Sequence, residues 1–245
     1  MLTEGLISMF VEKRRKVAQN RSLMMKFAPM LSELLSELTS KNARLIAVSK
    51  THPAHRVLEF YQKGLRIFGE NRPQEMLEKH AALPADIEWH QIGHLQTNKV
   101  KFIAPFVAMI HSVDSLRLLQ EIDRQALKNG RVIDCLLQFH IAAEETKFGL
   151  DEEEAMELLQ SAEFKALQNV RICGVMGMAT FTENKDQVRT EFRRLKTIFE
   201  TIKTTFFPNA PYFREISMGM SGDWQIALEE GSTLVRIGSL IFGER

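Results

Sequence analysis

The chain has 245 residues, of which 44% are hydrophobic and 26% are charged, with 32 Lys and Arg against 31 Asp and Glu. This composition is typical of a globular domain with a large core. The balanced charge provides no field that would attract nucleic acid or an acidic membrane, so we expect neither as a partner. The chain has no long uninterrupted apolar run and no secretory pattern at its N-terminus, which predicts a cytoplasmic protein.

Short apolar runs alternate along the chain with longer segments of helical period. Strands are predicted at residues 44–49, 66–69, 88–92, 107–111, 132–139, 171–176, 213–217 and 233–237. Helices are predicted at residues 54–63, 73–81, 97–104, 115–129, 152–162, 185–207 and 222–230. Strict alternation implies parallel strands, and eight of them favour an α/β fold with one closed (β/α)₈ TIM barrel over an open sheet.

A helical segment precedes the first predicted strand. Residues 1–40 include the run MLSELLSEL, which has helical periodicity. We expect this segment to pack on the barrel. Because no linker or break in composition separates it from the rest, residues 1–245 are predicted to form a single domain.

The predicted strand ends carry small, polar and glycine-rich segments. They are SKTHP, FGENRPQE, WHQIGHLQTNK, GVMGMAT, SMGMSGDW and VRIGSLIFG. In a TIM barrel, functional residues gather at the carboxyl ends of the strands. This pattern therefore indicates a ligand site at that end of the barrel.

Lys50 follows the apolar run that forms the first strand. An amine desolvated there has a lowered pKa and can form a Schiff base with a carbonyl compound. Alternatively, its side chain could extend into solvent or pair with a carboxylate such as Glu70. Glu70 and Asn71, at the second strand end, could likewise contact a ligand or tie loops together.

Two glycine-rich segments after the seventh and eighth strands suit an anion. SMGMSGD leads into a helix predicted to begin near Gly222, whose N-terminus would favour negative charge. In RIGS, Gly238 permits a close backbone approach and Ser239 offers a hydroxyl. Each segment alone could be a plain tight turn. Barrels often bind phosphate at these two loops, however, so the two segments and Lys50 together favour a phosphorylated carbonyl compound.

Two other kinds of site are not indicated. His90 and His94 are four residues apart, but HQIGH spans a strand end and lacks the glutamate of a zinc-protease motif, so no metal is expected. Ser217 and Ser221 lack the GxSxG elbow of a hydrolase.

The motifs AVSKTHP, FGENRPQE, WHQIGHLQTNK, SMGMSGDW and VRIGSLIFGER together resemble the pyridoxal phosphate homeostasis protein family, the YggS/PROSC-like proteins. The resemblance covers residues 44–245. It implies a fold-type III barrel similar to the N-terminal domain of alanine racemase, with pyridoxal 5′-phosphate (PLP) held as a Schiff base on Lys50. It also implies a carrier or buffer role in intracellular vitamin B6 homeostasis, without established catalysis, and apo-PLP enzymes as recipients.

The family's motifs carry further residues over to this chain. Asn71 matches the asparagine of the GEN motif, and Arg236 matches the arginine that faces the pyridine nitrogen. The phosphate-binding segments match residues 217–221 and 238–239. The implied cofactor-binding set is Asn71, Met178, Ser217, Gly219, Ser221, Arg236, Gly238 and Ser239.

The resemblance also bears on catalysis. A pyridine nitrogen beside Arg236 stays unprotonated, so the ring is a weak electron sink. Alanine racemases add a tyrosine base from a second domain, whereas Tyr61 and Tyr212 lie outside the strand-end motifs and Ala54 replaces another racemase tyrosine. We therefore expect a non-enzymatic PLP carrier that is a monomer. The alternatives are a weak fold-type III racemase or decarboxylase, a class I aldolase-like enzyme without PLP, and an interaction module.

Overall fold

The computed structural model describes residues 31–143 and 148–243 of the chain. The chain divides into two compact units, Met1–Ser40 and Lys41–Arg245. In the first unit, residues 31–40 are helical. Residues 1–30 lie outside the described range, so the packing of residues 1–40 on the barrel stays a prediction. Among the described helices, none combines the length and apolar character needed to cross a bilayer.

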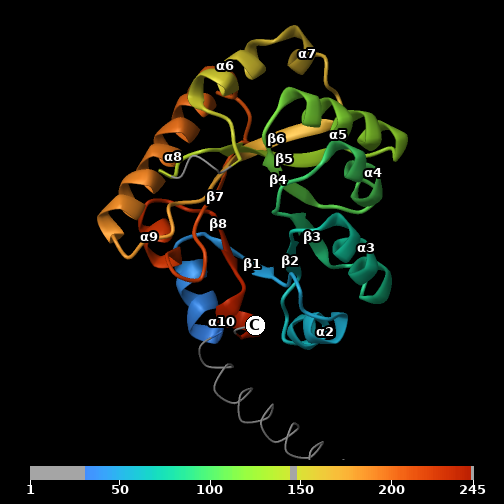
Figure 1. Ribbon diagram of the computed structural model, residues 1–245, viewed down its shortest axis with the longest axis vertical. Helices are drawn as coiled ribbons and strands as arrows, with labels where there is room; N and C mark the ends of the chain where they lie inside the picture. The colour runs from blue at the N-terminus through green and yellow to red at the C-terminus, as the bar shows by residue number, and fades with distance from the viewer. Residues whose placement is uncertain (1–30, 144–147, 244–245) are drawn as a thin grey trace, which may run out of the picture. The chain divides into compact units, whose positions relative to one another are not determined.

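The second unit contains a closed barrel of parallel strands that follow one another in sequence order (Figure 1). The strands are β1 (Arg44–Val48), β2 (Ile67–Glu70), β3 (Glu88–Gln91), β4 (Met109–Val113), β5 (Ile133–Phe139), β6 (Val170–Gly177), β7 (Glu215–Ser217) and β8 (Leu234–Ile237). The barrel closes where β1 pairs with β8, with Ile46 opposite Arg236. The predicted TIM barrel is confirmed, and each predicted strand is found with small shifts at its ends.

Helices follow the strands around the barrel. They are α2 (Ala54–Gln62), α3 (Pro73–Ala82), the 3₁₀ turn η1 (Thr97–Lys99), α4 (Val100–Ile103), α5 (Leu116–Lys128), α6 (Glu152–Gln160), α7 (Ala162–Lys165), α8 (Lys185–Phe206), α9 (Trp224–Glu229) and α10 (Ser239–Phe242). The short helices α7 and α10 were not predicted. The helix expected near Gly222 begins at Trp224, because the Asp223 N–H donates to Met220 O and closes a turn before it.

Alternation along β1 decides which side chains enter the barrel. Successive side chains of a strand point to opposite faces. Ile46 belongs to the inner apolar cluster, and Val48 and Lys50 follow it at a period of two and line a cavity. Ser49, on the opposite face, is fully buried against the surrounding helices. The other buried members of the inner cluster are Met109, Leu136, Cys173, Met176 and Leu234.

Candidate functional site

A cavity of about 730 Å³ opens among the carboxyl ends of the strands. Small-molecule sites typically have volumes of roughly 300–1,000 Å³. Loops after several different strands contribute to its lining, which is the expected place for a site in this fold. The predicted residues that line it are Lys50, Asn71, Met178, Ser221, Arg236, Gly238 and Ser239.

Ser217 and Gly219, the other two predicted residues, lie behind this lining and contact Arg236. Ser217 is fully buried, and its Oγ accepts a hydrogen bond from Arg236 Nη1 at 2.6 Å. Gly219 has φ of +90°, and a Cβ there would lie 2.6 Å from the Cβ of Ala227, so the position requires glycine. Its carbonyl accepts from the Arg236 backbone N–H at 3.0 Å. Both residues position Arg236.

Lys50 lies in a tight turn directly after β1. The His52 N–H donates to Ser49 O at 3.0 Å and closes this turn around Lys50 and Thr51. Thr51 has φ of +68°, a left-handed conformation that β-branched residues rarely adopt. Such a conformation persists only where its surroundings impose it, and it is common at functional sites.

A buried ion pair lies beside this turn, on the outer face of the strands. Lys79 Nζ lies 2.6 Å from Glu70 Oε1, and the same oxygen accepts from Ser49 Oγ at 2.6 Å. Burial raises the pKa of Glu70 to about 6, although Lys79 and Ser49 act in the opposite direction. Glu70 thus ties β1, β2 and α3 together, whereas Asn71, one residue on, lines the cavity.

Arg236 is held by oxygen atoms of the barrel wall. Its Nη1 donates to Ser217 O at 2.8 Å and to Ser217 Oγ, and its Nη2 donates to Gly177 O at 3.0 Å. A guanidinium has five N–H donors, so these contacts leave two that a ligand could engage. Burial lowers the pKa of Arg236 to about 10, partly offset by Asp223, so the group is charged at neutral pH.

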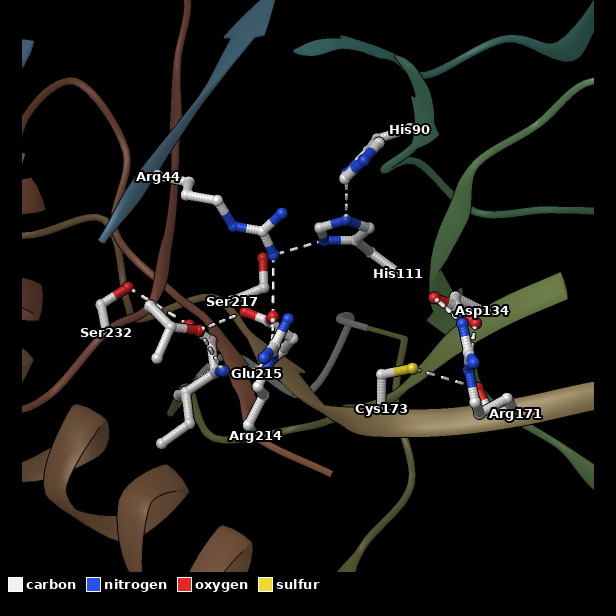
Figure 2. Close-up of polar contacts among 12 residues, drawn as sticks. Arg44, His90, His111, Asp134, Arg171, Cys173, Arg214, Glu215, Ser217 and Ser232 are labelled. Atoms are coloured by element: carbon white, nitrogen blue, oxygen red, sulfur yellow. Dashed lines mark hydrogen bonds and ion pairs between the residues drawn. The ribbon is translucent and has the colours of Figure 1, made fainter. Parts of the chain in front are cut away.

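Arg236 contacts a row of neutral side chains inside the barrel, of which Ser217, His111 and His90 are labelled in Figure 2. Ser217 Oγ lies 2.9 Å from His111 Nδ1, and His111 Nε2 lies 2.9 Å from His90 Nδ1. Burial lowers the pKa of His90 to about 3 and that of His111 well below its ordinary value. Arg236 can only donate, so Ser217 Oγ accepts from it; the Ser217 hydroxyl can then donate to His111 Nδ1, and His111 Nε2–H can donate to His90 Nδ1. We call Ser217, His111 and His90 the neutral row.

The loops after β7 and β8 meet at the cavity. Gly238 N–H lies 3.4 Å from Ser221 Oγ. A Cβ on Gly238 would lie 3.2 Å from Val48 O, so glycine keeps this loop close to β1. The helices that follow, α9 and α10, have six and four residues. An anion here would therefore meet hydroxyls and backbone N–H groups, with little contribution from the dipoles of such short helices.

Sequence reasoning missed several residues of the cavity. Gln138 and Phe148 belong to the fifth strand and the loop after it, a strand end that carries none of the six small, polar and glycine-rich motifs. Thr180 lies just beyond Met178, and its N–H and Oγ1 donate to Glu191 at 2.6 and 2.7 Å. The segment GVMGMAT already contained Thr180, so the strand-end rule could have found it.

The two histidines of HQIGH have separate surroundings. His90 is part of the neutral row, whereas His94 lines the cavity, stacks on Phe148 at 4.2 Å and lies 3.2 Å from the Asp114 carboxylate. Their spacing in sequence therefore does not bring them to a common site.

Comparisons with known proteins agree with this architecture. The family model described as alanine racemase, N-terminal domain, matches residues 31–245, which include every residue that lines the cavity. A pyridoxal phosphate homeostasis protein of Aquifex aeolicus is 44% identical over 204 residues, which cover 83% of this chain and 87% of that protein.

Two solved structures of PipY from Synechococcus elongatus have the same fold. The structure without PLP is 36% identical and has a TM-score of 0.82, covering 89% of this chain and 100% of that one. The structure with PLP bound is 37% identical and has a TM-score of 0.78, with the same coverage of 89% and 100%.

Proposed function

The chain belongs to the pyridoxal phosphate homeostasis protein family, and we propose that it holds PLP reversibly on Lys50 as a carrier and buffer of this cofactor. The position of Lys50 carries the proposal. From the turn after β1, its side chain lines a cavity that Arg236, Ser221 and Ser239 also line. An amine, a guanidinium and two hydroxyls are thereby brought together from the ends of three separate strands, β1, β7 and β8.

The donor set fits the chemistry of PLP. This cofactor supplies an aldehyde that an amine can capture reversibly. Lys50 would hold that carbon, and Arg236 would donate to the pyridine nitrogen. Ser221, Ser239 and the Gly238 N–H would bind the phosphate. The apolar lining residues Val48, Ile92, Met178 and Met220 suit the faces of an aromatic ring.

The same residues favour storage over catalysis. Arg236 is charged at neutral pH and would leave the pyridine nitrogen unprotonated, which weakens the ring as an electron sink. Neither tyrosine of the chain lines the cavity: Tyr61 donates to Asp86 at 2.7 Å from α2, and Tyr212 is 40% exposed. A racemase of this fold type would lack its tyrosine base. Weak racemase or decarboxylase activity remains the alternative.

We further propose that PLP passes from this chain to apo-PLP enzymes and that the chain acts as a monomer. An open cavity at the end of a barrel supports exchange with other proteins. Transfer is tested by mixing the loaded chain with an apo-enzyme and following recovery of that enzyme's activity. Gel filtration with light scattering tests the monomer.

The attachment to Lys50 is tested by the visible absorbance of the purified protein with added PLP. A band characteristic of bound PLP should appear, and borohydride should fix the cofactor to the peptide that contains Lys50, as read by mass. Lys50→Ala should abolish both results, whereas Lys128→Ala, an exposed position on α5, should keep them. Retention of the band in Lys50→Ala would overturn the proposal, and loss of an amino acid's α-deuterium at turnover rates would favour the racemase.

A further inference from the structure

The peptide groups on both sides of Lys50 are bound by charged side chains of α3 that the proposed function does not use. Lys79 Nζ donates to Ser49 O at 2.7 Å, just before Lys50. The Thr51 N–H, just after Lys50, donates to Glu75 Oε1 at 2.6 Å. Lys79 and Glu75 in turn pair with each other at 2.7 Å. One helix thus holds the backbone at both ends of the residue.

Every N–H donor of the Lys79 ammonium group is used in these contacts. It is 5% exposed, and its three N–H donors go to Ser49 O, Glu70 Oε1 and Glu75 Oε1. Three is the full donor capacity of an ammonium group. We call Glu70, Glu75 and Lys79 the charged cluster. Since Glu70 also binds the Ser49 hydroxyl, the charged cluster fixes Ser49 through both its carbonyl and its side chain.

The backbone that the charged cluster holds is strained at Thr51. A φ of +68° is unfavourable for a β-branched residue, and the bond from its N–H to Glu75 opposes relaxation. If that bond were lost, the peptide after Lys50 could rotate toward an ordinary conformation. The direction of the Lys50 side chain would then change, because the same turn carries both residues.

We propose that Lys79 and Glu75 are positioning residues for Lys50, which bind the peptide groups on either side of it and so fix the direction in which its amine enters the cavity. This inference rests on the proposed role of Lys50 and names the residues that keep it oriented. Neither Lys79 nor Glu75 is among the lining residues, so both act through the backbone. A reacting group that is already oriented before its ligand binds generally reacts faster.

The test compares Glu75→Ala with Glu78→Ala on the same helix. The Glu78 carboxylate accepts a hydrogen bond from Gln74 Nε2 at 3.1 Å within the same helix, so its removal leaves the bonds from Glu75 and Lys79 to the turn in place. The first readout is the rate of PLP capture, followed by absorbance. The second uses cofactor-free protein and measures how fast trinitrobenzenesulfonate modifies Lys50, identified by peptide mass.

Glu75→Ala should slow PLP capture about ten-fold or more, since small misplacements of a reacting group are costly. It should also raise the rate at which the small reagent modifies Lys50, because a loosened turn exposes the amine. Glu78→Ala should leave both rates at the wild-type level. Glu75→Gln keeps an oxygen acceptor for the Thr51 N–H and should recover most of the capture rate.

Each other outcome has a defined meaning. A lower melting temperature of Glu75→Ala with both Lys50 rates unchanged would show a structural role alone and overturn the inference, as would equal slowing by Glu78→Ala. Failure of the wild-type chain to capture PLP would instead refute the proposed function. The modification of Lys50 in cofactor-free protein would still decide whether Glu75 orients the amine.

Discussion

Different interactions hold the two sides of the cavity in place: ion pairs on one side and hydrogen bonds to neutral groups on the other. On the β1–β2 side, the turn around Lys50 is held by the charged cluster, which lies between the strands and α3. On the β7–β8 side, Arg236 is held by carbonyl groups and by the neutral row inside the barrel. The difference follows from which elements meet: the outer face of β2 packs against α3, so Glu70 can pair with Lys79, whereas Arg236 meets strand carbonyls and neutral side chains within the barrel.

The two supports also respond to pH with opposite sign. Glu70 has a pKa raised to about 6, so its contribution to stability is full below its unfolded pKa and is lost as the pH rises through 6. His90 has a pKa lowered to about 3, so its contribution is present above its unfolded pKa of about 6.5 and is lost as the pH falls toward 3.

Acidification should have the largest effect, and it acts on the neutral row. Between pH 6.5 and 3, His90 is protonated in the unfolded chain but stays neutral in the folded chain. Acidification over this range therefore lowers the unfolding free energy by on the order of 5 kcal/mol. Glu70 offsets a smaller part of this loss. Urea unfolding at a series of pH values measures the slope.

Variants at two histidines test whether His90 causes this dependence of the unfolding free energy on pH. His90→Gln retains hydrogen-bonding groups without a titrating ring, so the loss of unfolding free energy on acidification should be smaller than in the wild type. His55→Gln, at an exposed position on α2, should keep the wild-type slope. An unchanged slope in His90→Gln would show that the neutral row does not govern acid stability.

Loss of Lys79 should have the next largest effect, and it acts on the charged cluster. Lys79→Met leaves the buried Glu70 carboxylate without its cation and should cost roughly 3–5 kcal/mol of unfolding free energy. Adding Glu70→Gln removes the stranded charge and should restore a large part of that loss. Urea unfolding of the two single variants and the double variant measures the coupling energy between Lys79 and Glu70. If the losses of unfolding free energy in the single variants simply add in the double variant, the two residues do not form a stabilising ion pair.

The smallest predicted effect concerns the strain at Thr51. Thr51→Gly removes the steric cost of a positive φ but adds flexibility to the unfolded chain, so the net gain in unfolding free energy should reach at most about 1 kcal/mol. Thr204→Gly, at an exposed helical position on α8, should instead lower stability by roughly 0.3 kcal/mol. Equal losses in the two variants would show that Thr51 is unstrained.

The barrel and the position of Lys50 at the end of its first strand could both be predicted from the amino-acid pattern alone. Apolar runs alternating with helical segments predict parallel strands, and the period of two along β1 follows from backbone geometry alone. Strand-end motifs then identified most of the cavity, including Asn71, Arg236 and Gly238. These features depend only on the spacing of residues that are close together in the sequence, so the sequence is enough to predict them.

The contacts that hold those residues in place could not be predicted from the amino-acid pattern. Ser217 and His111 are 106 residues apart, and Lys79 and Ser49 are 30 apart, so no local pattern marks either pair. The contacts of Ser217 and Gly219 with Arg236 likewise join different strand ends. Such contacts form only when the barrel closes, because closure brings the inner faces of separate strands together and packs α3 against β1 and β2.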